Sequence, residues 1–241
     1  MIRESNDATW NDLHMIPDGW YPNEFLVRFL AKYVRKRTGL ASYQVKRPDV
    51  RRILDLGCGI GRHVVMLAQE GYDTAGIDIA HNAVRFAEKW LQTLGLTADL
   101  RIGSIIRLPW PDNHFDAIVS HGVLDHMTPD EGRAAVQEAR RVLKPGGLFY
   151  LSLASTDEYS CGRGGKVDVD TFRLTEGDEA GLIQRFFSLE SVNALLSGFD
   201  IQDVVYDCWQ PVQGRGFSAL DVNDFGKLAR FHIAASSLKA S

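Results

Sequence analysis

A short apolar segment that runs directly into a glycine-rich turn constrains this chain more than any other feature. Residues 53–56 are Ile-Leu-Asp-Leu, and Gly57, Gly59 and Gly61 follow at alternate positions. Glycine permits backbone angles and close approaches that a Cβ atom would block, so a ligand can lie against the main chain there. If a helix starts after Gly61, its free N–H groups and its dipole favour a bound carboxylate or phosphate. We therefore expect a buried strand, a ligand-binding turn and a helix over residues 52–70.

Strand and helix patterns alternate from this turn onward. We expect strands at 52–56, 73–77, 98–102, 115–120 and 148–153, and helices at 62–70, 81–94 and 128–143. Thr128 and Glu131 have capping-box spacing with Pro129 between them, which predicts the start of the last helix. Such regular alternation predicts a parallel sheet with helices on both faces.

The segments that flank this core have different patterns. Apolar residues recur at helical spacing over 24–37, and Pro22 suits the first position of that helix. The polar, glycine-rich stretch 154–185 predicts an irregular insertion. A helix at 188–197 and strands at 199–206 and 229–235 follow it. The expected organisation is a helical cap over 1–50, a ligand-binding core over 51–153, and a lid plus strands completing the same sheet over 154–241.

An acid, Asp78, follows the second expected strand about 20 residues after the first glycine, where a carboxylate can accept both ribose hydroxyls of a nucleoside. The alternative is a loop acid that only caps the next helix. The glycine spacing is GxGxG, and Arg62 stands where the GxGxxG turn of a nicotinamide-dependent dehydrogenase has its third glycine. The dehydrogenase reading is therefore the less favoured one.

The bulk composition narrows the class of protein. The 241 residues are 45% hydrophobic and 24% charged, as in an ordinary globular protein, and the net charge of −4 disfavours an enzyme that grips long nucleic acid. Cys58, Cys161 and Cys208 are widely spaced without a CxxC pair, which predicts neither a disulfide framework nor a metal site. Without an apolar signal core or a membrane-length apolar run, we expect a cytoplasmic protein with no membrane partner.

Four segments together resemble the class I S-adenosylmethionine-dependent methyltransferases. Residues 55–63 (DLGCGIGRH) resemble the first motif of that superfamily, and residues 76–80 (GIDIA) resemble its ribose motif. Residues 101–120 resemble the adenine loop with the fourth strand, and residues 141–152 (RVLKPGGLFYLS) the turn and fifth strand that follow. The resemblance implies an α/β fold, namely a Rossmann-like, seven-stranded, mostly parallel sheet with helices on both faces and a C-terminal antiparallel strand. It also implies S-adenosyl-L-methionine as methyl donor and S-adenosyl-L-homocysteine as product.

Position by position, the resemblance also implies how the donor is held. Asp55 would orient its ammonium, Asp78 would hold the ribose and Ile79 would pack on adenine. Ser104 and Ile105 stand at the adenine-recognition position, where the family often has an aspartate that accepts from the amino group. The residues lining the methionine end would be Gly57, Cys58, Gly59 and Gly61, with Leu108 and the backbone near His121 completing the pocket.

His121 follows the fourth strand at the sheet edge where ligands of open α/β folds bind, and it is the first candidate for a general base or a substrate contact. The alternative is that it offers only backbone to the donor. Asp125 is a weaker catalytic candidate, and we expect His126 to be structural.

The acceptor site is predicted from two segments outside the core. Trp20 and Tyr21 in the N-terminal turn and Tyr159 and Arg163 in the insertion are candidate substrate contacts, with lid packing or solvated charge as the alternative. The favoured function is O- or N-methylation of a small molecule such as a sugar, a sugar nucleotide or a secondary-metabolite intermediate. The alternative within the same superfamily is methylation of a protein or a tRNA.

Overall fold

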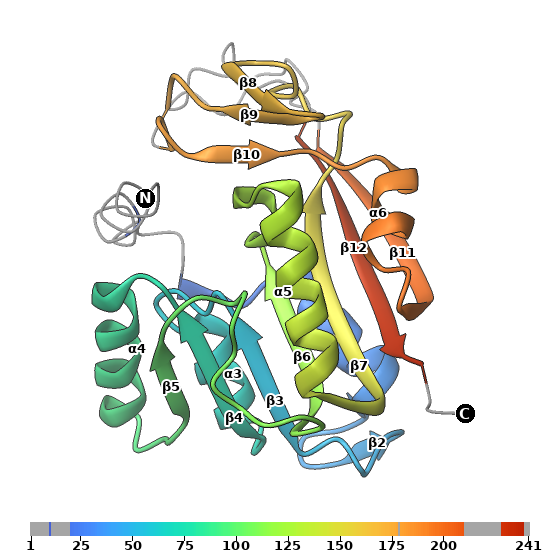
Figure 1. Ribbon diagram of the computed structural model, residues 1–241. Helices are drawn as coiled ribbons and strands as arrows, with labels where there is room; N and C mark the ends of the chain where they lie inside the picture. The colour runs from blue at the N-terminus through green and yellow to red at the C-terminus, as the bar shows by residue number, and fades with distance from the viewer. Residues whose placement is uncertain (1–9, 11–19, 178, 210–227, 239–241) are drawn as a thin grey trace, which may run out of the picture.

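A seven-stranded sheet forms the centre of the protein (Figure 1). The computed structural model describes residue 10 and residues 20–177, 179–209 and 228–238. The strand order is β11-β12-β7-β6-β3-β4-β5. These strands are β3 (Arg52–Leu56), β4 (Asp73–Asp78), β5 (Asp99–Ile102), β6 (Phe115–His121), β7 (Leu143–Ala154), β11 (Phe199–Trp209) and β12 (Leu228–Ser237). Because β12 pairs antiparallel with β7 and β11 while the other neighbours pair in parallel, the predicted fold is confirmed.

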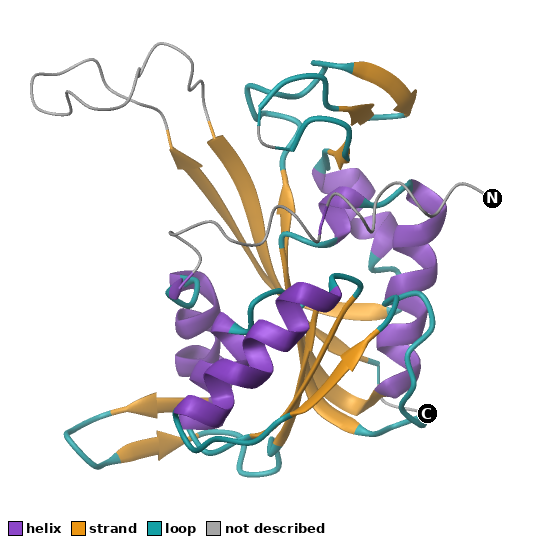
Figure 2. Cartoon of the chain, turned by 90° about the vertical axis from the view of Figure 1, so that its left-hand side faces the viewer, coloured by secondary structure: helices purple, strands orange, loops and turns teal. Residues whose placement is uncertain are grey.

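Helices cover both faces of this sheet, as Figures 1 and 2 show. On one face, residues of β3, β6 and β7 pack against α2 (Glu24–Phe29), the π-helix η2 (Leu30–Val34) and α3 (Arg62–Gln69). On the other face, the alternate residues of the same strands pack against α5 (Pro129–Val142) and α6 (Leu189–Leu195). The remaining helix, α4 (His81–Thr93), joins β4 to β5 and packs against α3. This double burial explains why these strands are almost continuously apolar.

The helix after β6 begins where the sequence predicts. The Thr128 side chain accepts from the backbone N–H of Glu131, the Glu131 carboxylate accepts from the Thr128 N–H, and Pro129 occupies the first turn. The C-terminal end differs from the expectation, because β7 already starts at Leu143 and includes the Lys144-Pro145-Gly146-Gly147 stretch that predicts a turn.

The N-terminal helix is shorter than its apolar spacing predicts. The α-helix spans Glu24–Phe29, widens into the π-helix η2 and ends at Val34. Residues 35–45 then form a hairpin of β1 (Arg35–Arg37) and β2 (Tyr43–Val45). The backbone N–H groups of Lys46 and Arg47 donate to the Val34 carbonyl. They therefore occupy the acceptor that the N–H groups of a further helical turn would use. Pro22 precedes the capping residue Asn23 and is not the first helical residue.

The insertion after β7 contains a small sheet where the sequence predicts irregular structure. Strands β8 (Gly165–Asp168), β9 (Thr171–Arg173) and β10 (Ile183–Arg185) pair antiparallel, and they lie above the carboxyl ends of β6 and β7 in Figure 1. The His126 Nδ1 donates to the Ile183 carbonyl at 3.0 Å, which ties β10 to the 3-10 turn η3 (Leu124–His126). His126 thus has the structural contact expected of it.

Candidate functional site

The glycine turn after β3 has a backbone that only glycine adopts without strain. Gly57 and Gly61 have φ angles of 66° and 88°, in the left-handed region. A Cβ on Gly57 would collide with both γ-methyl groups of Val123, and a Cβ on Gly61 would lie 2.6 Å from that of Ala87. Both glycines are therefore required by the backbone angle and by close packing against Val123 and Ala87, which together hold the turn in its conformation.

The Cys58 side chain faces away from this turn. It is buried with residues of α3 and α4, and burial raises the pKa of its thiol well above the usual value. Only the backbone of Cys58 is therefore available to line the site.

Asp78 ends β4 beside the glycine turn, and its carboxylate is held by two backbone amides. One oxygen accepts from the Gly59 N–H at 2.8 Å, and the other accepts from the Ala80 N–H at 2.8 Å. Ala80 is the N-cap residue of α4, so Asp78 ties the start of this helix to the glycine turn without bonding to the N–H groups of the first helical turn. Each carboxylate oxygen keeps a second lone pair for a ligand hydroxyl.

Asp55 is the most unusual acid of the site. It is 1% exposed, and its Oδ2 is one of three buried side-chain atoms in the described residues without a hydrogen-bond partner. Nδ1 of His63 lies 3.8 Å from this oxygen, beyond hydrogen-bond distance. Burial raises the pKa of the Asp55 carboxyl to about 8. A buried acceptor left without a donor is costly, so this oxygen suits a cationic group that arrives with a ligand.

The segment after β5 lies next to Asp78. The Gly103 N–H donates to the Asp78 carbonyl, which brings Ser104 and Ile105 to this edge of the sheet. Ile105 is buried, and the Ser104 hydroxyl has only a long contact of 3.5 Å with the Ile106 N–H. The backbone N–H of Leu108 is already bonded to the Glu138 carboxylate, so Leu108 can offer packing but not this donor.

His121 is the last residue of β6, and its ring packs edge-on against His63 with 5.6 Å between centroids. The residue is half-buried, but its Nδ1 is sealed from solvent and has no partner. Burial, followed by the charges around it, lowers the pKa of His121 well below its usual value. Burial thus favours the neutral form of the ring, which can offer a lone pair to a hydrogen-bond donor.

Asp125 does not offer a free carboxylate. One oxygen accepts from the Ala154 N–H at 2.9 Å, and the other forms an ion pair of 2.6 Å with Arg230. The side chain joins η3 to β7 and β12, a structural arrangement that disfavours the expected role as a base.

The four residues expected to contact substrate lie in two pairs, one at the N-terminal turn and one in the insertion. The Trp20 ring packs edge-on against Phe86 and Trp90 of α4, and Tyr21 is 82% exposed. In the insertion, the Arg163 guanidinium lies 5.0 Å from the centre of the Tyr159 ring. Contact of these four side chains with a substrate stays a prediction.

Sequence reasoning missed several groups beside His121. His63, the second residue of α3, is buried, and burial lowers its pKa to about 3. His232 of β12 is also buried, and its ring is stacked with that of His121 at 6.1 Å. Tyr150 donates to Asn23 and bonds to His232. One sequence signal could have indicated His232. It is a histidine within a mostly apolar strand, and buried strands seldom contain a histidine without a partner.

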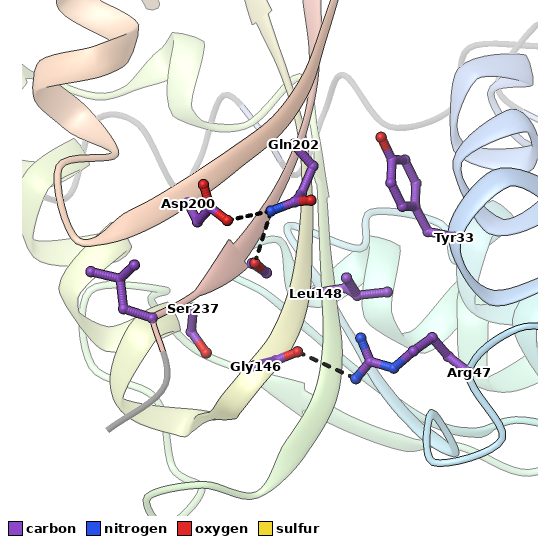
Figure 3. Close-up of a pocket in the computed structure, with 9 residues that line it drawn as sticks. Tyr33, Arg47, Gly146, Leu148, Asp200, Gln202 and Ser237 are labelled. Carbon is purple, nitrogen blue, oxygen red and sulfur yellow. Dashed lines mark hydrogen bonds between the residues drawn. The ribbon is translucent and has the colours of Figure 1, made fainter. Parts of the chain in front are cut away.

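A separate cavity of about 370 Å³ lies at the opposite end of the sheet (Figure 3). Arg47 donates to the Gly146 carbonyl there, and the Gln202 amide lies between Asp200 and Ser236. These groups are already bonded to one another, and none belongs to the glycine turn. Among the described residues, no helix is long and apolar enough to cross a membrane, and no three His, Cys, Asp or Glu side chains form a metal-binding group.

Known proteins match the core that holds this site. Residues 54–151 match the family described as "Methyltransferase domain". A probable S-adenosylmethionine-dependent methyltransferase from Mycolicibacterium smegmatis is 28% identical over 188 residues, which cover 76% of this chain and 63% of that protein. A 2-methyl-6-phytyl-1,4-hydroquinone methyltransferase from Synechocystis is 35% identical over 106 residues, or 44% of this chain and 32% of that protein. The chain thus spans less than two thirds of the length of these curated relatives.

A crystal structure of a methyltransferase from Methanosarcina mazei has the same fold. It superimposes with a TM-score of 0.63 at 25% identity, covering 79% of this chain and 94% of that one. The domain match, the relatives and the strand order agree, and the core of this chain is similar in sequence and in fold to S-adenosylmethionine-dependent methyltransferases.

Proposed function

We propose that the protein transfers the methyl group of S-adenosylmethionine to a small-molecule acceptor, through an oxygen or a nitrogen atom. The observation that carries the proposal is the pair of carboxylates around the glycine turn. Asp55 has a buried oxygen with no partner, and Asp78 is held by two amides with lone pairs to spare. A ligand with a cation at one end and a sugar diol at the other suits both acids.

The donor fits this chain residue by residue. Its ammonium would satisfy Asp55 Oδ2, its carboxylate would lie near the free N–H groups that open α3, and its ribose would bond to Asp78. Ile79, Ser104 and Ile105 would hold the adenine. The donor supplies a methyl group on a sulfonium, which an acceptor lone pair displaces in line.

What the protein adds to such a displacement is mainly position. Holding two reactants in alignment converts a bimolecular step into an effectively unimolecular one and supplies a large part of the acceleration. An acceptor hydroxyl or amine also has a proton to lose. The ring of His121, at the carboxyl end of β6, is a suitable group to contact that acceptor.

Two observations favour a small acceptor. Two relatives are named for small-molecule substrates, a phytylated hydroquinone and a sterol. The net charge of −4 also gives this chain no excess of positive charge for a long polyanion such as tRNA.

Calorimetry with S-adenosylhomocysteine followed by a transfer assay tests the proposal. We expect the wild type to bind the product and Asp78→Ala to bind it about 100-fold more weakly, because charge-assisted hydrogen bonds contribute roughly 1.5–3 kcal/mol each. Asp73→Ala, at the far end of β4, is the matched control. The wild type should then label a component of a metabolite extract from methyl-labelled donor. Wild-type protein that does not bind the product would refute the proposal, and label in tRNA or protein alone would refute a small acceptor.

A further inference from the structure

Three histidine rings lie side by side on the face of the sheet that α2 and α3 cover. His63 follows the glycine turn, His121 ends β6, and His232 belongs to β12. His121 and His232 both stand opposite Ser152 of β7 in the strand register, so their side chains share one face. The row leads from the glycine turn toward β7 and β12, away from Asp78. Neighbouring ring centres lie 5.6 Å and 6.1 Å apart.

The hydrogen bonds around Asn23 determine the orientation of its side chain. The Phe25 N–H donates to Asn23 Oδ1 at 2.9 Å, so this atom must be the carbonyl oxygen of the amide. The Tyr150 hydroxyl lies 3.3 Å from the same oxygen and can only donate to it. The lone pairs of the Tyr150 oxygen are then left to accept a hydrogen bond.

His232 supplies that hydrogen bond. Its Nδ1 lies 3.0 Å from the Tyr150 oxygen, and when the hydroxyl proton points to Asn23, Nδ1 is the donor of this hydrogen bond. A neutral imidazole has one protonated nitrogen, so Nε2 of His232 carries a lone pair. The chain Asn23–Tyr150–His232 therefore selects the tautomer with a basic Nε2.

Nε2 of His232 is free to act. Among the described residues it has no hydrogen-bond partner, and it is not one of the three unpartnered atoms that are sealed from solvent. The ring itself is held in place, since Phe25 stacks on it at 3.8 Å with 11° between the planes. A fixed ring with a free lone pair facing accessible space has the form of a general base.

We propose that His232 is a catalytic residue whose Nε2 accepts the acceptor's proton, with Tyr150 and Asn23 as positioning residues. This inference rests on the methyltransfer function proposed above. The acceptor is then a hydroxyl compound. Its oxygen lone pair forms the new C–O bond while the donor's S–CH3 bond breaks with its electrons on sulfur. The O–H proton passes to Nε2, and the resulting imidazolium returns it to water after product release.

The charges around the row favour oxygen over nitrogen as the attacked atom. The positive charges of Arg62 and Arg230 act to lower the pKa values of Tyr150 and His121. The charge of Arg230 also acts to lower the pKa of His232. His63 and His121 are held neutral, and burial followed by Arg230 lowers the pKa of His232 to about 4. The nearby guanidinium groups stabilise a developing oxyanion, so an acidic hydroxyl such as a phenol or enol, whose proton a weakly basic ring can accept as the oxygen attacks, is the class that fits.

The tautomer can be measured without knowing the acceptor. Long-range ¹H–¹⁵N spectra of the wild type, with the His232 ring identified by its NOEs to Phe25, should show a neutral ring protonated on Nδ1 from pH 5.5 to 8. Tyr150→Phe should move the proton population toward Nε2. A wild-type ring protonated on Nε2, or charged at neutral pH, would overturn the proposal whether or not any variant folds.

Turnover on the labelled component of the extract provides the second test. His232→Gln should bind S-adenosylhomocysteine within threefold of wild type and lose transfer by 100-fold or more, and Tyr150→Phe should shift the pH profile of transfer. His114→Gln, at the opposite end of β6, is the matched control. Wild-type turnover in His232→Gln would refute this inference alone, whereas loss of product binding by the wild type would refute the proposed function instead.

Discussion

The affinity for S-adenosylhomocysteine should rise steeply with pH, because Asp55 must ionise to pair with the ligand ammonium. Burial raises the pKa of this carboxyl to about 8, so the free protein holds it protonated at neutral pH. Pairing with a cation favours the ionised form, and binding therefore releases a proton. Affinity is lowest at acid pH and approaches its limit as the pH rises through about 8.

The size of the effect follows from the ionised fraction of Asp55. With a pKa of about 8, that fraction rises from about 1% at pH 6 to about 24% at pH 7.5. The dissociation constant should fall about 25-fold over this range, which corresponds to about 2 kcal/mol. His63 and His121 do not contribute, since burial keeps their pKa values below this window.

Calorimetry in two buffers of different ionisation enthalpy measures both the affinity and the proton release. At pH 7 we expect about 0.9 proton to leave per ligand bound, and Asp55→Asn should remove both the release and the pH dependence. Asp73→Asn, an exposed acid at the start of β4, should keep both. An affinity that changes less than twofold between pH 6 and 7.5 in the wild type would refute the assignment of the unpartnered oxygen to the ammonium.

Three further variants test other parts of the structure. Gly57→Ala should destabilise the fold by about 1–3 kcal/mol in urea titrations and abolish ligand binding, because the new methyl group meets Val123; Val123→Ala in the same chain should recover part of the stability. Asp125→Asn should cost roughly 3–5 kcal/mol of unfolding free energy by leaving Arg230 without its buried partner, while an unchanged midpoint would contradict the structural role. Trp20→Ala should lower the melting temperature by a few degrees through loss of its two ring contacts, each worth about 0.5–1.5 kcal/mol. Product affinity should stay the same, and a lower affinity would mean that Trp20 touches the donor.

Local sequence signals predicted the elements whose determinants lie within one segment. The capping box at Thr128 and the left-handed glycines of the turn are such cases, since the residues that make the contact are adjacent in the chain. The strand ending at Asp78 was also predictable, because apolar residues and a following helix pattern define it.

Features that depend on distant pairing were missed. Residues 24–37 have helical spacing throughout, but the helix ends at Val34 because residues 46 and 47 return to its carbonyl. The strands of the insertion are three or four residues long, and β8 is exposed at every position, so it has no alternation to detect. His232 lies next to His121 only through the register of β12 on β7, which no local pattern encodes.

The position of β12 has a consequence for how the protein is assembled during synthesis. The groups proposed to bind the donor come from a continuous stretch, residues 52–121, whose strands pair in parallel with one another. The proposed base comes from residues 228–237, which must slot between β7 and β11 after both have emerged from the ribosome. We therefore expect a growing chain to acquire affinity for the donor well before it can use it, so that methyl transfer is withheld until β12 has been synthesised and has paired with β7 and β11.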